Sequence, residues 1–169
     1  MAIRTTGIDH MHINVRSIDG FLELFGRLFE LDSTMVSLVE SIGAYNTTVR
    51  LRGVSSDQPF LDVFEPARPG CAVSRHIERR GEGVAILSFG VDDIDAAADH
   101  AATCGLREVS RIGFPGVMKQ VQFDPADTFG FMLELVQYEP GHEAAIAEIQ
   151  RAKAAGEPVP GLSVRDHKG

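Results

Sequence analysis

Two histidines and two carboxylates stand where this chain could carry out metal or acid–base chemistry. His10 and His12 are two residues apart in an extended apolar segment, so both point the same way if that segment is a strand. Asp62 is the one charged residue in FLDVF, and Glu134 is the one charged residue in FMLELV. A carboxylate among apolar strand neighbours is costly to bury unless it is paired, and metal coordination is one way to pair it. Imidazole and carboxylate ligands together suit a divalent ion such as Zn, Fe, Mn, Co or Ni.

Polar side chains alternate along two further extended segments. Asn46, Thr48 and Arg50 share one face of the first segment, and Gln120 and Gln122 share a face of the second. If these faces line a cleft, all five residues contact a substrate, and Arg50 can hold a carboxylate, phosphate or enolate oxygen. If the sheet is exposed, the same residues simply face solvent.

The chain repeats itself, which indicates how these residues are positioned. Residues 15–19 read VRSID and residues 91–95 read VDDID. Each stretch follows an extended apolar segment and precedes apolar residues at helical spacing. Residues 60–64 (FLDVF) and 132–136 (MLELV) then close the two copies at matching places. Asp62 and Glu134 therefore occupy equivalent positions in the two halves of the chain.

Each copy has room for two more strands between its helix and its last strand, which predicts the order strand, helix, strand, strand, strand. We predict an α+β fold of two such βαβββ modules with a C-terminal helix. The predicted boundaries are 1–66 for the first module, 67–83 for a linker with a short helix over 72–80, 84–138 for the second module, and 139–169 for the C-terminal helix and tail.

Composition limits the classes of partner. The 169 residues include 16 Lys plus Arg against 24 Asp plus Glu, a net charge of −8. This balance argues against nucleic acid or an anionic membrane as the main partner and leaves a small molecule. No apolar run approaches the ~20 residues of a membrane helix, and the first residues lack a secretion-signal pattern, so we expect a cytoplasmic protein. The two cysteines have no CxxC spacing and are expected to be ordinary thiols.

The layout resembles the vicinal oxygen chelate superfamily, most closely its glyoxalase and methylmalonyl-CoA epimerase branch. The resemblance covers residues 7–138 and is carried by IDHMHINVRSIDGFLELFGRLFEL, FLDVFEP, RRGEGVAILSFGVDDIDAA and FDPADTFGFMLELVQY. It implies paired βαβββ modules whose curved sheets enclose a cleft. Such modules commonly pair within one chain or across a dimer, and both arrangements stay open for this chain. A homodimer is the expected assembly.

The resemblance also implies a metal site on the first and last strands of each module. Its ligands would be His10, Asp62 and Glu134. The remaining ligand position falls on Ile86, because relatives often read GEGxHH where this chain reads GEGVAIL, and isoleucine cannot bind a metal. Two interpretations follow. Either His12 substitutes as a ligand, or the metal site is degenerate and the cleft works without a metal.

A second departure concerns the reaction. Epimerases of this family use a glutamate as one base where this chain has Asn46, and an amide cannot abstract a proton at neutral pH. A two-base epimerisation of methylmalonyl-CoA would therefore lack one base. The first hypothesis is a lyase or isomerase that acts on a small carbonyl or thioester substrate through a divalent metal and an enolate-like intermediate. His12 and Glu134 would be its catalytic residues. The alternatives are a metal-free acid–base isomerase or cyclase on the same fold, and a small-molecule binding protein of the bleomycin-resistance type.

Overall fold

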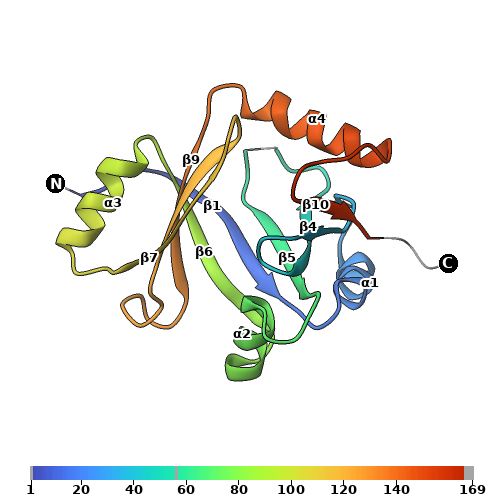
Figure 1. Ribbon diagram of the computed structural model, residues 1–169, viewed down its shortest axis with the longest axis horizontal. Coiled ribbons are helices and arrows are strands. Elements are labelled where there is room, and N and C mark those ends of the chain that lie inside the picture. Colours follow the sequence, from blue (N-terminus) through green and yellow to red (C-terminus); the bar gives the residue numbers. More distant parts are fainter. Residues whose placement is uncertain (1, 56, 166–169) are drawn as a thin grey trace. The chain divides into compact units, whose positions relative to one another are not determined.

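The structure is a computed structural model that describes residues 2–55 and 57–165 (Figure 1). Within those residues the chain forms ten strands and four helices. In chain order they are β1 (Thr5–Asn14), α1 (Ile18–Leu28), β2 (Leu31–Ser33), β3 (Ser37–Val39), β4 (Ala44–Leu51), β5 (Phe60–Pro66), α2 (Ala72–Arg80), β6 (Gly83–Val91), α3 (Ile94–Thr103), β7 (Glu108–Phe114), β8 (Met118–Phe123), β9 (Met132–Tyr138), α4 (His142–Ala154) and β10 (Leu162–Val164).

These elements form two compact units. The first unit comprises Met1–Met11 and Ala85–Ala147, and the second comprises His12–Val84 and Glu148–Gly169. Strand β1 and helix α4 each begin in the first unit and end in the second. The continuous strand β1 therefore fixes His10 and His12 relative to each other, although the boundary falls between them.

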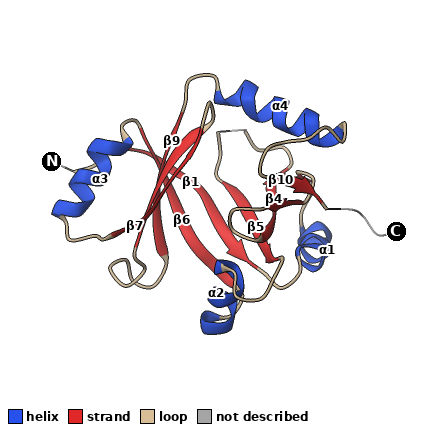
Figure 2. Ribbon diagram, viewed as in Figure 1, coloured by secondary structure: helices blue, strands red, loops and turns tan. Residues whose placement is uncertain are grey.

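The first unit is a sheet with the strand order β1-β6-β9-β8-β7, covered by α3 (Figure 2). β6 and β9 run parallel, whereas β9, β8 and β7 run antiparallel to their neighbours. The apolar core forms between α3 and one face of the sheet. Its buried members are Val91, Ile94, Ala97, Ala98, Ala101, Val121, Phe123 and Leu135. Residues at alternate positions on β6, β8 and β9 consequently face away from this core.

The second unit has the strand order β10-β3-β4-β5-β1, and the short strand β2 pairs with β4. Its main core packs α1 against β4 and β5, with Val15, Ile18, Phe21, Val36, Val49 and Val63 buried. A smaller cluster packs α2 against Ala44 and Phe64. In this unit, too, alternate residues of β4 and β5 lie on the face opposite the main core.

The repeated VRSID and VDDID stretches are helix-capping segments. In the first copy the Ser17 side chain accepts a hydrogen bond from the backbone N–H of Gly20 at 3.0 Å. In the second copy Asp93 does the same for Ala96 at 3.0 Å. A side-chain oxygen at this position satisfies one of the free N–H groups of the first helical turn. The repeat thus encodes two equivalent helix starts, each placed directly after a strand.

The predicted α+β fold is confirmed, including the order strand, helix, strand, strand, strand in the second copy. The first copy has one additional short strand, β2, and part of the predicted tail forms β10, which pairs antiparallel with β3. Helix α2 spans the residues predicted for the short helix. None of the helices in the described part of the chain is both long and apolar enough to cross a membrane.

Candidate metal and acid–base site

A buried histidine–carboxylate pair lies in the first unit, on the face of the sheet opposite α3. His10 on β1 is 1% exposed, and Glu134 at the centre of β9 is fully buried. The His10 Nε2 atom lies 3.3 Å from Glu134 Oε1. These are the two residues that the sequence pattern singled out on the first strand of one module and the last strand of the other.

Two glutamines hold the buried carboxylate in place. Gln120 donates from Nε2 to Glu134 Oε1 at 3.1 Å, and Gln122 donates from Nε2 to Oε2 at 2.8 Å. Both belong to β8, where Gln122 pairs directly with Glu134 across the ladder. Each carboxylate oxygen thus has a donor, which offsets part of the cost of burying the charge. The predicted role of Gln120 and Gln122 in substrate binding stays a prediction; their observed contact is with Glu134.

The second nitrogen of His10 is held by the preceding residue. His10 Nδ1 lies 2.6 Å from Asp9 Oδ2, and the Tyr138 hydroxyl donates to the same oxygen at 3.0 Å. Because the carboxylate accepts from Nδ1–H, the contact favours the tautomer whose Nε2 lone pair is directed toward Glu134. A carboxylate behind a histidine in this way is typical of histidines that bind metals. Sequence reasoning missed Asp9 and Tyr138, and only the Asp-His pair in the first strand pointed to Asp9.

The donor set fits a divalent metal. Strand β1 runs unbroken through His10 and His12, so alternation places both imidazoles on one face. His10, His12 and Glu134 each offer one ligand atom, and these atoms lie within 4.8 Å of one another. Two imidazole nitrogens and one carboxylate oxygen form a set that Zn, Fe, Mn, Co and Ni accept. Ile86, at the position where the family resemblance implies another ligand, contributes no donor atom.

The remaining predicted site residues lie in the second unit, on neighbouring strands β4 and β5. Thr48 donates its hydroxyl to Asp62 Oδ1 at 2.6 Å, and the two residues pair directly across the ladder. Asn46 Nδ2 donates to the backbone carbonyl of Val63 at 3.4 Å. The guanidinium of Arg50 lies 4.4 Å from the centre of the Phe60 ring. The sheet therefore brings Asn46, Thr48, Arg50 and Asp62 to adjacent positions; the role of Asp62 as a ligand and of the other three in substrate binding stay predictions.

The second unit also contains a buried lysine that sequence reasoning did not identify. Lys153 on α4 is 6% exposed, and its Nζ donates to the backbone carbonyl of Met35 at 2.9 Å. Burial lowers the pKa of Lys153 from its ordinary value, and the negative charge of Asp62 partly opposes this shift. Its position near the end of the C-terminal helix gave no signal, because lysines on helices usually face water.

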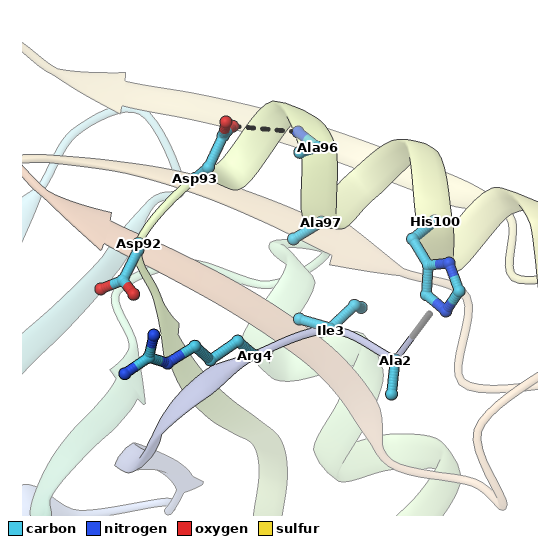
Figure 3. A pocket seen from close by; sticks show the side chains of 8 residues that line it. All are labelled: Ala2, Ile3, Arg4, Asp92, Asp93, Ala96, Ala97 and His100. Atoms are coloured by element: carbon cyan, nitrogen blue, oxygen red, sulfur yellow. Dashed lines mark hydrogen bonds between the residues drawn. The ribbon is translucent and has the colours of Figure 1, made fainter.

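A separate open hollow of about 420 Å³ lies in the first unit, between the N-terminal segment and the start of α3 (Figure 3). Ala2, Ile3 and Arg4 line one side, and Asp92, Asp93, Ala96, Ala97 and His100 line the other. Figure 3 shows the Arg4 side chain extending toward Asp92. None of the predicted site residues lines this hollow.

Of the comparisons with known proteins, the one with solved structures found matches. No family model matches the sequence, and no curated protein matches it. Among solved structures, methylmalonyl-CoA epimerase from Mycobacterium tuberculosis superimposes with a TM-score of 0.72 at 20% identity, covering 85% of this chain and 95% of that one. A variant of the Streptomyces coelicolor epimerase, in complex with 2-nitronate-propionyl-CoA, gives a TM-score of 0.69 at 25% identity, covering 79% and 98%. A methylmalonyl-CoA epimerase in complex with methylmalonyl-CoA and ammonium gives the same TM-score and identity, covering 79% and 95%.

This chain has the vicinal oxygen chelate fold. The fold that the sequence resemblance implied is thereby confirmed, and the similar structures are epimerases, which are isomerases. The superposition covers 95%, 98% and 95% of those three structures.

Proposed function

We propose that this protein is a metal-dependent enzyme of isomerase type that moves a proton at the carbon beside a carbonyl or thioester group. The observation that carries this proposal is the buried His10–Glu134 pair, with His12 two residues along the same strand. The similarity to methylmalonyl-CoA epimerases supports the reaction class. The thioester of an acyl-CoA is accordingly the first substrate class to test, with other small carbonyl compounds second.

In this proposal His10, His12 and Glu134 hold the metal. A divalent ion bound there would polarise the carbonyl oxygen of the substrate and stabilise enolate-like charge. Asp9 holds the Nδ1 proton of His10, so that Nε2, which faces Glu134, is the nitrogen that would bind the metal. Gln120 and Gln122 fix the orientation of the Glu134 carboxylate, so little reorganisation is needed when the site is loaded.

We assign His12 to the metal, because its ring nitrogen lies within 4.8 Å of the ligand atoms of the other two residues, and the proton taken from the substrate carbon then passes to a water molecule in the site. The assignment has a direct test. If His12 is a ligand, His12→Ala loses metal together with activity. If His12 is instead the general base, the same variant keeps its full metal content and loses only the proton-transfer step.

The test of the reaction class is hydrogen exchange at carbon. Wild-type protein is incubated in D₂O with a panel of acyl-CoA thioesters, methylmalonyl-CoA among them, and deuterium uptake is followed by mass spectrometry. We expect uptake of one deuteron by at least one thioester, a loss of at least about 100-fold in Glu134→Gln, and wild-type rates in the matched control Glu108→Gln. Glu108 is a suitable control because it lies on β7 and pairs with Arg111 at the surface. Exchange that survives unchanged in Glu134→Gln would overturn the proposal.

A second candidate is the same proton transfer without a metal. One observation favours it: Glu134 already has donors for both oxygens from protein side chains, so the pair is stable as an acid–base couple. Treatment with a chelator separates the two, because the metal enzyme loses exchange and recovers it with one metal, whereas the metal-free enzyme is unaffected. Stoichiometric capture of a small molecule without any exchange would point to the binding-protein alternative.

The proposal requires a small molecule as the partner and no nucleic acid or membrane. The homodimer and the cytoplasmic location stay predictions. Light scattering on the purified protein measures the first of these directly.

A further inference from the structure

Ser88 carries a buried hydroxyl group that has no hydrogen-bond partner among the described residues. The residue is fully buried within β6. Buried polar atoms in folded proteins are almost always hydrogen-bonded to protein, to ordered water or to a ligand. An orphaned hydroxyl therefore marks a place where a small polar group is expected to bind.

The hydroxyl stands beside the candidate metal site. Ser88 pairs with Glu134 in the parallel ladder between β6 and β9, so their side chains project from the same face of the sheet. The residues that follow them, Phe89 and Leu135, pack in the core beneath α3 on the opposite face. Ser88 is thus on the side of the sheet that carries the buried carboxylate, away from the apolar core.

Both carboxylate oxygens of Glu134 already accept hydrogen bonds. Gln120 and Gln122 each donate to one of its oxygens, and His10 approaches Oε1 as well. Ser88 is consequently in position to serve a different acceptor on this face. A serine hydroxyl suits that task, because it adds no charge and can rotate its proton toward an oxygen atom.

The internal repeat aligns Ser88 with His12 of the first copy. The position that matches His10 in the second copy is Ile86, and the position two residues further on, which matches His12, is Ser88. Each copy therefore places a polar side chain two residues beyond the first ligand position of the family. In the second copy, where isoleucine has removed the ligand, Ser88 is the polar group that the strand offers.

We propose that the Ser88 hydroxyl donates a hydrogen bond to the oxygen atom taken up at the His10–Glu134 site. That oxygen belongs to water in the resting enzyme and to the substrate carbonyl during turnover. The inference rests on the proposed function, since it assumes that the site binds a metal and an oxygen ligand. It assigns Ser88 a direct contact with the substrate, where it would stabilise the same developing charge.

The test compares Ser88→Ala with a matched control, Ser37→Ala. Ser37 is also buried, but its hydroxyl already donates to the carbonyl of Met35 at 3.1 Å, in the second unit. Three quantities are measured for each variant: the melting temperature without metal, the dissociation constant for Co²⁺ by competition with a chromogenic chelator, and the dissociation constant of the Co²⁺-loaded protein for malonate.

For Ser88→Ala we expect an unchanged or higher melting temperature without metal, because an unsatisfied hydroxyl is removed. We expect at least one of the two dissociation constants to rise about 5- to 10-fold, as for the loss of one hydrogen bond. A rise in the Co²⁺ constant assigns the bond to water, and a rise in the malonate constant assigns it to the ligand oxygen. Ser37→Ala should melt at a lower temperature and bind both probes as the wild type does.

The experiment distinguishes failure of the Ser88 inference from failure of the proposed function. Wild-type dissociation constants for both probes in Ser88→Ala overturn the inference and leave the proposed function standing. A wild-type protein that binds no Co²⁺ overturns the metal-dependent function and the inference with it.

Discussion

Replacing Asp9 by asparagine is the most informative single change to the candidate site, because it removes a charge and keeps the shape. Asp9 Oδ2 lies 2.6 Å from His10 Nδ1, and Asp9 is partly exposed, with 19% of its side-chain area accessible. A hydrogen bond to a charged group contributes about 1.5–3 kcal/mol, against about 0.5–1.5 kcal/mol for a neutral one. Replacing the carboxylate by an amide should therefore weaken the hydrogen bond to His10 Nδ1 by about 1–1.5 kcal/mol, and the partial exposure of Asp9 favours the lower value.

That difference corresponds to about a 5- to 13-fold weaker metal affinity. Its upper end reaches the lower end of the 10- to 100-fold loss that is usual when the carboxylate behind a metal-binding histidine is changed. The assay is competition with a chromogenic chelator for Zn²⁺ and for Co²⁺, on protein first stripped of metal. The fold must be intact, which near-ultraviolet circular dichroism of the variant verifies.

Tyr138→Phe is the control for this prediction. It removes the Tyr138 hydroxyl, which donates to Asp9 Oδ2 at 3.0 Å, and leaves the contact between the carboxylate and the His10 imidazole. We expect its metal affinity to stay within about threefold of the wild type. Equal affinities for wild type and Asp9→Asn would refute the argument that the carboxylate tunes His10.

Three further predictions concern stability. Thr48→Val removes a hydroxyl that donates to Asp62 at 2.6 Å, and should lower the free energy of unfolding in urea by about 1 kcal/mol; a change below the error of the measurement would count against that bond. Because burial lowers the pKa of Lys153 from 10.5, the unfolded chain binds this proton more tightly than the folded protein does. The stability of wild type relative to Lys153→Met should therefore rise as the pH rises toward 10.5, and a difference independent of pH would contradict the assignment. Ile18 is fully buried in the core of the second unit, so Ile18→Ala should cost about 2–4 kcal/mol in the same urea experiment, and a cost below 1 kcal/mol would mean that the site collapses around the gap.

The fold could be predicted because the periodicities of strands and helices are local, and the same order of patterns occurs twice in the chain. The VRSID and VDDID stretches identified the two helix starts, where Ser17 and Asp93 are the capping side chains. Strand alternation also placed His10 and His12 on one face. The short strands β2 and β10 were not predicted, because three residues are too few to show a period.

The site was only partly predictable, for a physical reason. The alternation of side chains along a strand predicts which residues share a face. It places consecutive residues such as Asp9 and His10 on opposite faces, so it cannot predict the contact between their side chains. Nor can it show which buried groups lack a partner. In the sequence Ser88 is an ordinary small residue in an apolar strand. Its proposed role depends on its register with Glu134 and on the absence of a hydrogen-bond partner among the described residues.

The metal site is tested most directly by the metal content of the untagged protein, purified without chelator and measured by mass spectrometry beside His10→Ala and His12→Ala. We expect close to one divalent metal per wild-type chain and little in either variant. No metal in the wild type, even after incubation with Zn²⁺, Mn²⁺, Co²⁺, Ni²⁺ and Fe²⁺, would contradict it, and His10 and Glu134 would then act as an acid–base pair alone.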